Sequence, residues 1–326
     1  MRHVLINYNL LGDGLMATPS IRAYKKTLSE DDELVMITSN EQFQKIYEGN
    51  PYIDRIVYVT EEQRNKLFTK YVKFDEKDLY RGFGKLTEFT DKNGNKEMAC
   101  IMEVGKAFSW CTKHPKLTQI NVGGINRTFT VVPHFAYAFA DQLKVTIDSP
   151  HYDIWLTEEE IAWGESYLKS YKKPVLLCAA LSKSCTSRDP KVSGLPANKM
   201  LAVSVWNEVI EELKGDYDFV FVAGPGEPLI EVNANWEQGL PIRQVASLCK
   251  AAKSVVSVDT GIGHIAQGVD ANIVSICAAV PRSLTSVEHT KGKYYCVDHT
   301  NENPLVEQGI HNVTSREIVD GIRRVA

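Results

Sequence analysis

Three glycine-containing stretches of the sequence combine reactive side chains with backbone that a ligand can approach closely. The first, LLGDG at residues 10–14, carries Asp13 between two glycines just after an apolar run. A carboxylate in that position either caps or shapes the turn at a helix start, or serves as a general base that accepts a proton from a substrate hydroxyl. Its position alone gives these two interpretations about equal weight.

The second stretch, VAGPGEP at residues 222–228, places Glu227 after a Gly-Pro-Gly turn. Turn formation alone accounts for both glycines and the proline. A glutamate is also favourable at the start of a helix, which is where we expect Glu227 to lie. By itself this stretch is weak evidence for a site.

The third stretch, SVVSVDTGIGHIAQG at residues 254–268, is the most informative. A β-branched strand ends at Asp259, Thr260 and Gly261 open a helix, and His264 follows one turn later. Free amides at a helix N-terminus beside a glycine bind phosphate groups, and His264 can donate to a phosphate oxygen. A simple cap and a buried histidine explain each residue singly, but they explain the combination less well.

The same stretch fits a loose dinucleotide-binding fingerprint, Gly261-x-Gly263-x-x-Ala266. That fingerprint requires an acidic residue about 20 positions further on, at the end of the next strand. The next strand here ends in CAAVP instead. A nicotinamide-dependent oxidoreductase is therefore the weaker alternative.

The sequence contains no group of His, Cys and Asp residues with the spacing of metal ligands. The tripeptide Asp216-Tyr217-Asp218 resembles the metal-binding Asp-x-Asp motif of some sugar transferases. It precedes a strand, however, and so lies at the amino end of a sheet, away from the edge where ligands bind. We interpret it as a solvated turn.

The three stretches require a framework of parallel strands, and the sequence predicts one. In the first half, strands at 3–8, 33–38 and 55–59 alternate with helical segments at 15–28 and 41–49, and a helix follows at 134–145. After a break at 148–150, Thr157 and Glu160 form a capping signal for a helix over 157–171. The second half predicts strands at 174–180, 218–224, 254–258 and 272–276, and helices at 198–214, 243–251, 260–268 and 315–324. This alternation indicates βαβ units and parallel sheets, which bind ligands beyond the carboxyl ends of their strands.

Length and composition indicate two globular domains. The chain has 326 residues, of which 44% are hydrophobic and 24% charged, and its net charge is −4. No strongly basic field indicates nucleic acid as a partner, although a local patch stays open. Seven scattered cysteines without a CxxC pair predict reduced thiols in a cytosolic protein. We expect no signal peptide and no membrane-spanning segment, while peripheral membrane contact stays open.

In chain order, these features resemble glycosyltransferase family 9, the ADP-heptose:lipopolysaccharide heptosyltransferases. The resemblance rests on LLGDGLMATPSIRAYKK, GNPYIDRIVYV, WLTEEE, VAGPGE and LPIRQVASLCKAAKSVVSVDTGIGH, and the Asp-Thr-Gly-x-x-His motif at 259–264 is its most specific element. It implies an α/β protein with the GT-B fold, in which two Rossmann-like domains with parallel sheets face a central cleft. Residues 1–156 would form the acceptor-side domain and residues 157–326 the donor-binding domain, and the terminal helix either stays with the second domain or packs back on the first.

The resemblance also implies roles for individual residues. Asp13 matches the catalytic base, and Lys199, which stands seven positions before Trp206, matches the lysine that meets the diphosphate, with Lys191 as the fallback. The implied donor-binding positions are Gly12, Ser182, Lys183, Gly224, Glu227, Leu240, Asp259, Thr260, Gly261 and His264.

Within that set, Ser182 would contact phosphate, Glu227 the donor ribose, and Leu240 the base. The residues from Asp259 to His264 would hold the donor sugar and the diphosphate.

The implied reaction is an inverting, metal-independent transfer of a heptose-like sugar from an ADP-linked donor to a glycan hydroxyl, such as one in the lipopolysaccharide core. The nucleotide-sugar would be a co-substrate and no cofactor would be needed. The acceptor could be anionic, and the protein would be cytoplasmic, with the inner face of the membrane as one location.

Two departures leave the acceptor and the sugar open: CAAVPRSLTS replaces the family's Phe-Gly-x-Thr turn, and residues 62–130 have no clear family match. The alternatives are a transferase acting on a modified nucleic-acid base, the oxidoreductase above, and a non-catalytic nucleotide-binding module.

Overall fold

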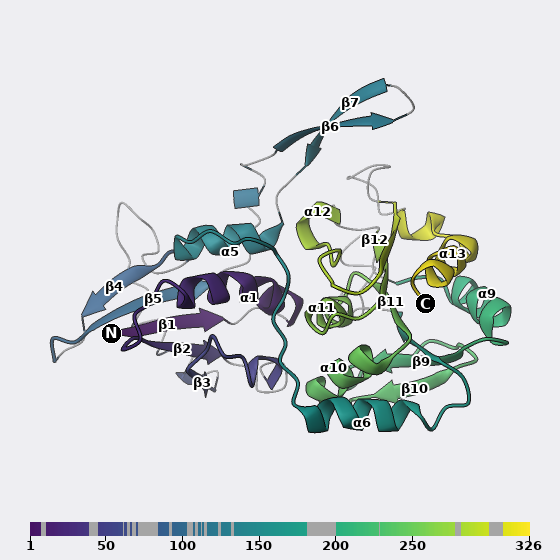
Figure 1. The fold of residues 1–326 in the computed structure, drawn as a ribbon, viewed down its shortest axis with the longest axis horizontal. Coiled ribbons are helices and arrows are strands. Elements are labelled where there is room, and N and C mark those ends of the chain that lie inside the picture. Colours follow the sequence, from purple (N-terminus) through teal and green to yellow (C-terminus); the bar gives the residue numbers. More distant parts are fainter. Residues whose placement is uncertain are drawn as a thin grey trace. The chain divides into compact units, whose positions relative to one another are not determined.

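The computed structural model describes most of the chain. The described residues are 1–7, 11–38, 45–60, 84–90, 93–102, 116–122, 125–131, 134–180, 200–227, 229–277, 282–299 and 309–326, together with isolated positions between 62 and 70 and between 107 and 113. They form two compact units, Met1–Asp153 and Ile154–Ala326. Each unit contains a mainly parallel sheet with helices packed on it (Figure 1), which confirms the predicted α/β class.

In the sheet of the first unit, the strand order reverses at the first strand: the next strands in the sequence lie on one side of it and the later strands on the other. Its strands are β1 (Arg2–Asn7), β2 (Glu33–Thr38), β3 (Arg55–Tyr58), β4 (Thr87–Thr90) and β5 (Lys96–Met102), in the order β3-β2-β1-β5-β4. Strand β1 pairs in parallel with both β2 and β5, and only β4 runs antiparallel. Ligands bind beyond the carboxyl ends of the strands at such a reversal point, so the residues that follow β1 lie where a site is expected.

Among the described residues, this unit also contains helices, a short 3-10 helix and a hairpin. They are α1 (Leu11–Lys25), η1 (Lys45–Tyr47), α5 (Phe135–Leu143) and the antiparallel pair β6 (Lys116–Val122) and β7 (Ile125–Val131). Helices α1 and α5 pack side by side (Figure 1), and the Ser20 hydroxyl donates to the Ala136 carbonyl at 2.9 Å.

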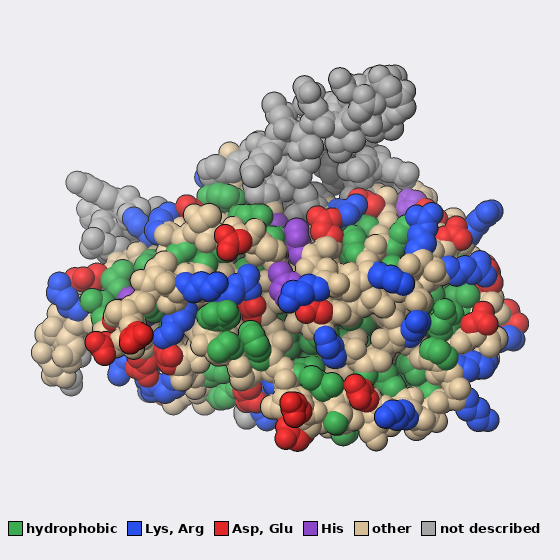
Figure 2. Space-filling view, viewed as in Figure 1, with side chains coloured by type: hydrophobic (Ala, Val, Ile, Leu, Met, Phe, Trp, Pro, Cys, Tyr) green, Lys and Arg blue, Asp and Glu red, His purple; other side chains and the backbone are tan. Residues whose placement is uncertain are grey.

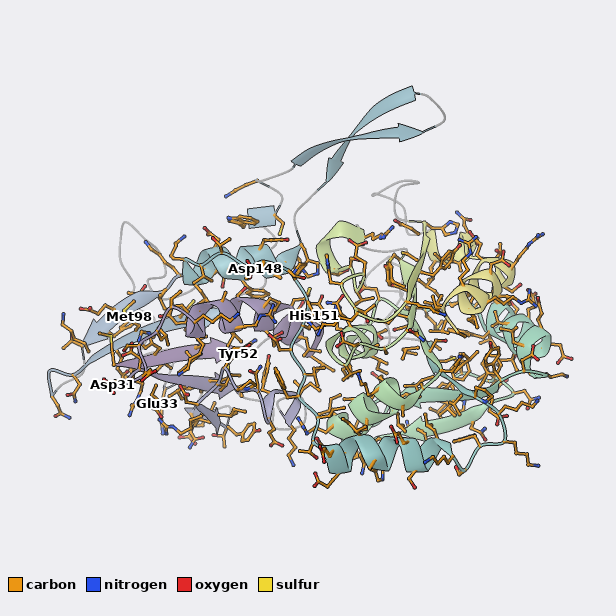
Figure 3. All side chains as sticks on the ribbon, in the orientation of Figure 1. Asp31, Glu33, Tyr52, Met98, Asp148 and His151 are labelled. Carbon is orange, nitrogen blue, oxygen red and sulfur yellow. The ribbon has the colours of Figure 1, made fainter. Side chains whose placement is uncertain are left out.

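The charged residues at the amino ends of these strands pair with one another. Arg2 contacts Glu97 at 3.2 Å and Glu33 at 3.4 Å, and Glu33 also accepts from Arg55 at 2.9 Å. Figure 3 shows Asp31 and Glu33 at the end of the sheet where β2 begins. Arg2 lies opposite Glu33 and Glu97 on the neighbouring strands, so these two pairs stabilise strand register.

The second unit has the strand order of a dinucleotide-binding Rossmann fold. Its six strands are β8 (Val175–Ala179), β9 (Asp218–Ala223), β10 (Asn235–Gln238), β11 (Ser254–Val258), β12 (Ile273–Cys277) and β13 (Tyr294–Asp298). All pair in parallel, in the order β10-β9-β8-β11-β12-β13. Numbered within the unit, this is 3-2-1-4-5-6, so the sheet reverses between β8 and β11.

The helices of this unit alternate with its strands. They are α6 (Glu158–Leu168), α9 (Val203–Leu213), α10 (Ile242–Ala251), α11 (Gly261–Gly268), α12 (Arg282–Thr285) and α13 (Ser315–Val325), with a 3-10 turn η3 (Gly309–Asn312). One core lies between the sheet and α9 and α13, and it contains the fully buried Trp206, Phe221 and Ile322.

Helix α6 begins as the sequence predicts and packs closely on α10. Thr157 accepts from the Glu160 amide at 3.2 Å, while the Glu160 carboxylate accepts from the Thr157 amide at 2.8 Å. The same carboxylate pairs with Arg243 of α10. Gly164 lies against the backbone of Ser247, so the two helices approach more closely than a larger side chain would permit.

Several predicted boundaries differ from the structure. Helix α1 begins at Leu11 and not near Leu15, and α9 begins at Val203 and not at 198. Within the predicted helix at 41–49, the described residues 45–49 form η1 and a turn, and the predicted strands do not include β10 or β13.

No helix in the described part of the chain combines the length and the apolar character that crossing a membrane requires.

Candidate functional site

The Asp-Thr-Gly-x-x-His motif lies at the reversal point of the second sheet. Asp259 directly follows β11, Thr260 is the N-cap residue of α11, and His264 lies in the helix one turn later. Strand β11 neighbours β8 at the position where the strand order reverses. A ligand at the carboxyl ends of these strands would therefore meet the N-terminus of α11, which favours an anion.

The Thr260 side chain does not cap its helix. It makes no capping hydrogen bond, and its hydroxyl instead lies 3.1 Å from the Ser257 hydroxyl. A Cβ atom at Gly263 would come within 3.2 Å of that same Ser257 oxygen, so this close packing favours glycine. The Thr260 side chain therefore does not accept a hydrogen bond from the first backbone amides of α11.

His264 and Asp259 face each other. The His264 Nε2 atom lies 3.8 Å from the Asp259 Oδ1 atom, and the two side chains are 6% and 13% exposed. The sequence predicts that His264 opens toward a ligand, whereas the structure places it buried beside Asp259. The carboxylate can orient the imidazole ring.

Glu227 lies in a turn, so the prediction that it starts a helix is wrong. Its carboxylate accepts from the Gly224 amide at 2.6 Å, and its own amide donates to the Gly224 carbonyl at 3.1 Å. Gly226, at φ +70°, supplies the left-handed conformation that this turn requires. Glu227 is half-buried, and Gln238 of β10 donates to its carbonyl at 2.7 Å.

Leu240 lies between β10 and α10 and is also half-buried. It follows Gly239, whose amide donates to the Ala223 carbonyl at 3.0 Å. The turn at 224–227 and the segment at 239–240 therefore meet at the carboxyl end of β9.

Asp13 is the third residue of α1, so the prediction that it lies in a loop before the first helix is wrong. Gly12 and Gly14 lie in the same helical turn, and neither has a positive φ. An acidic residue in the first turn is stabilised by the helix dipole, which explains why the helix can start this early. Asp13 is half-buried at the reversal point of its sheet.

Tyr47 and Asn7 surround this helix start. Both are buried, and the Asn7 side chain donates to the Tyr47 hydroxyl at 3.1 Å. A Cβ atom at Gly14 would collide with the same hydroxyl. Burial, and secondarily the negative charge of Asp13, raises the pKa of Tyr47, so its proton stays on the oxygen.

Four of the sequence-predicted residues lie outside the described residues: Ser182, Lys183, Lys191 and Lys199. Trp206, which was used to locate Lys199, is fully buried and packs edge-on against Phe221 with ring centres 5.1 Å apart.

Sequence reasoning did not identify Asn7, Tyr47 or Ser257 as neighbours of the motifs. Asn7 and Ser257 are polar residues in otherwise apolar strands, and that signal could have found them. Tyr47 carries no such signal, since its contacts with Asn7 and with the start of α1 depend on the tertiary fold.

Metal-ligand geometry is absent from the described part of the chain, which contains no group of three or more His, Cys, Asp or Glu side chains that could hold an ion. Asp216 and Tyr217 lie before β9, at the amino end of the sheet, as predicted. The Asp218 carboxylate accepts from the Lys173 amide at 2.9 Å, which gives it a structural partner.

Charges of both signs are interspersed over the visible face of the molecule. Figure 2 shows Lys and Arg side chains mixed with Asp and Glu on the described residues of that face, without one large basic surface. This distribution agrees with the net charge of −4.

Comparison with known families and structures identifies the fold. Residues 238–311, which include Leu240 and the 259–264 motif, match the model of glycosyltransferase family 9 (heptosyltransferase). A search of curated proteins finds no significant match.

Three solved structures with the GT-B fold match nearly the whole chain. A family 9 glycosyl transferase from Veillonella parvula is 14% identical, with a TM-score of 0.63 over 99% of this chain and 96% of that one. The ADP-heptose lps heptosyltransferase II of E. coli is 11% identical, with a TM-score of 0.64 over 100% and 98%. The dodecameric, iron-containing heptosyltransferase TibC of enterotoxigenic E. coli, solved with ADP-D-beta-D-heptose, is 14% identical, with a TM-score of 0.56 over 99% and 76%. The chain therefore has the GT-B fold, and its residues 238–311 resemble glycosyltransferase family 9.

Proposed function

We propose that the chain transfers a heptose-like sugar from an ADP-linked donor to a hydroxyl group of a glycan such as the lipopolysaccharide core. Transfer proceeds with inversion at the anomeric carbon and requires neither a metal nor a cofactor beyond the nucleotide-sugar co-substrate. The protein acts in the cytoplasm, at the inner face of the membrane where such a glycan is accessible.

One observation carries this proposal. The Asp259–His264 motif lies at the reversal point of a sheet with order 3-2-1-4-5-6, at the N-terminus of α11. The same segment matches the family 9 model. An anion-binding helix start at that position favours a nucleotide diphosphate, and the absence of an acid at the end of β12 argues against NAD.

The donor binds the second unit through three groups of residues. Thr260, Gly261 and His264 hold the diphosphate and the sugar, together with Asp259, which orients His264. Glu227 contacts the ribose through its carboxylate, and Gly224 lets the nucleotide approach the backbone of the turn. Leu240 packs against the base, and Ser182 and Lys183 add phosphate contacts.

Asp13 accepts the proton of the acceptor hydroxyl as that oxygen attacks the anomeric carbon. A half-buried carboxylate at the carboxyl end of β1 is in a suitable position to act as this base. Gly12 keeps the backbone beside it accessible. The attack from the face opposite the leaving group gives inversion.

The leaving nucleoside diphosphate gains negative charge as its bond to the sugar breaks. Lys199, His264 and the first amides of α11 stabilise that charge, which is the task a divalent cation performs in other transferases. Removal of one such donor typically slows a reaction by about 10²–10³.

Calorimetric titration with ADP, in the absence of divalent metal, tests the donor site. His264→Ala removes a charge-assisted hydrogen bond worth about 1.5–3 kcal/mol, so ADP affinity should fall about 10- to 100-fold. His289→Ala, which removes a half-buried histidine elsewhere in the same unit, is the matched control and should bind as the wild type does.

Equal ADP affinity of His264→Ala and wild type would overturn the site assignment, provided that both melt at similar temperatures and that no other nucleoside diphosphate distinguishes them. Thermal protection by NAD but not by ADP would favour the oxidoreductase instead.

A further inference from the structure

Ser257 carries a buried hydroxyl beneath the proposed donor motif. It is the fourth residue of β11 and only 1% exposed, and its neighbours Val256 and Val258 belong to the core formed with α9 and α13. Alternate residues of a strand point to opposite faces, so Ser257 points to the other face of the sheet. There it meets α11, since a Cβ atom at Gly263 would come within 3.2 Å of the Ser257 oxygen. A polar group buried in this way requires hydrogen-bond partners, and these partners define its role.

The two partners of Ser257 fix the direction of its hydrogen bonds. The Ser257 hydroxyl oxygen lies 2.6 Å from the Val258 carbonyl oxygen, which can only accept, so Ser257 donates its single proton there. The same hydroxyl oxygen lies 3.1 Å from the Thr260 hydroxyl, so in that contact Thr260 is the donor. The Thr260 hydroxyl is thus bound to β11 through its own proton, and not to the amides of its helix.

Thr260 has the backbone of an ordinary N-cap residue but lacks the side-chain hydrogen bond of one. Its φ of −136° and ψ of 167° are extended, as is typical of N-cap residues. Two other threonines of the chain do cap their helices. Thr157 accepts from the Glu160 amide at 3.2 Å, and Thr314 accepts from the Glu317 amide at 3.4 Å. Because the backbone of Thr260 is already suitable, rotation about its Cα–Cβ bond would bring the hydroxyl toward the amides of α11.

A side-chain cap on α11 would compete with a ligand. A capping oxygen accepts from the second or third amide of a helix, and a phosphate at a helix start is bound by the same group of amides. The third amide of α11, that of Gly263, donates to the Thr260 carbonyl at 3.1 Å. The second, that of Ile262, is therefore the amide for which a cap and a phosphate would compete. Holding the Thr260 hydroxyl on Ser257 leaves this amide to an anion.

We propose that Ser257 is a positioning residue of the donor site, which holds the Thr260 hydroxyl away from the start of α11 so that the first amides of this helix bind the diphosphate. Ser257 acts through Thr260 and does not itself touch the nucleotide. The identity of the ligand rests on the proposed function, whereas the arrangement of the two hydroxyls does not. A merely structural serine would support folding alone, and its loss would lower stability without a specific change in nucleotide affinity.

Calorimetric titration with ADP, without divalent metal, compares the wild type with Ser257→Ala and with the double variant Ser257→Ala/Thr260→Ala. In the single variant, Thr260 loses its partner and rotates to cap α11. ADP affinity should then fall by about 2- to 30-fold, the range that an N-cap hydrogen bond spans when it is expressed as a ratio of affinities. In the double variant the competing oxygen is absent, so ADP affinity should rise again toward the wild-type value.

Ser254→Ala is the matched control for the loss of a buried serine hydroxyl. Ser254 begins the same strand and is fully buried, and its hydroxyl has no hydrogen-bond partner within the described part of the structure. This variant should bind ADP as the wild type does. The melting temperature of each variant shows whether it folds normally.

Hydrogen exchange of the ligand-free chain tests the arrangement of the two hydroxyls independently of ADP. The peptide that contains Ile262 should exchange more slowly in Ser257→Ala than in the wild type, because a capped amide is protected, and the double variant should lose this protection. Unchanged exchange in Ser257→Ala would overturn the proposal, as would unchanged ADP affinity or a double variant that binds ADP no more tightly than the single variant. A Ser257→Ala chain that does not fold would show a structural serine instead. If the wild type binds no ADP at all, the proposed function fails, and hydrogen exchange then decides by itself whether Ser257 keeps Thr260 from capping.

Discussion

Gly14 offers a sharp test of how the structure positions Asp13. A Cβ atom at this position would collide with the Tyr47 hydroxyl, whereas the Tyr47 Cζ atom and the Asn7 Nδ2 atom would each lie 3.6 Å away, in ordinary contact. The hydroxyl oxygen alone therefore excludes alanine. The perturbation is a double-mutant cycle of Gly14→Ala and Tyr47→Phe.

The expected free energies follow from these contacts. Alanine in a helix is favoured over glycine by about 0.5–1 kcal/mol, but forcing a methyl group into a packed site costs about 1–3 kcal/mol. Gly14→Ala should thus destabilise the wild type by up to about 2.5 kcal/mol. Tyr47→Phe removes the oxygen and leaves the Asn7 amide without that partner, at a cost of about 1–3 kcal/mol. In the Tyr47→Phe background, Gly14→Ala should be stabilising, by up to about 1 kcal/mol.

Urea unfolding of the wild type, the two single variants and the double variant measures whether the effect of Gly14→Ala on stability changes sign. Hydrogen exchange of the α1 amides shows whether the effect arises in the first unit. Gly215→Ala, where a Cβ would have nothing within 4 Å, controls for glycine substitution in general. Equal destabilisation by Gly14→Ala in both backgrounds would refute the described packing around Asp13.

Two further predictions concern the effect of metal removal on sugar transfer and the effect of low pH on stability. Excess EDTA should leave the rate of sugar transfer unchanged, and a rate that collapses in EDTA and returns with magnesium, manganese or iron would show that a metal takes the role assigned to Lys199. The hydrogen bond from Arg243 lowers the pKa of Glu160 in the folded protein, so this pair stabilises the protein above the unfolded pKa and loses that contribution as pH falls through the lowered value. As pH falls below about 4.5, the free energy of unfolding of Glu160→Gln should therefore decrease less than that of the wild type, as measured by urea unfolding at several pH values. Glu158→Gln, in the same helical turn, should show the same pH dependence as the wild type.

Local sequence signals predicted the elements that depend on local chemistry. The strands at 33–38 and 254–258 match β2 and β11 because each is an apolar, β-branched-rich run between polar residues. The capping box of Thr157 and Glu160 is present with both of its hydrogen bonds. The sequence also predicted that the 259–264 motif follows a strand, because the apolar run at 254–258 ends directly before Asp259.

Tertiary contacts account for what the sequence did not predict. Glycine disfavours helix, so residues 12–14 suggested a loop, but the contact of Gly14 with Tyr47 explains why glycine is retained inside α1. Strand β10 is short, polar and at the sheet edge, and its pairing with β9 is not visible in its own residues. The contact of Tyr47 with the start of α1 likewise depends on the tertiary fold and not on local sequence.

The central claim is that Asp13 is the general base, and Asp13→Asn tests it most directly. Asparagine keeps a hydrogen-bond acceptor at the helix start, so a structural role would be felt as a stability loss of up to about 1 kcal/mol with activity retained. A base that cannot accept the proton should instead cost about 10²–10⁴ in turnover. The measurement is sugar transfer by wild type and Asp13→Asn, with a donor and acceptor pair found by screening nucleotide-sugars, alongside ADP calorimetry and melting temperature. The account predicts a variant that folds and binds ADP as the wild type does yet transfers almost no sugar, and turnover above about a tenth of the wild-type value would contradict it.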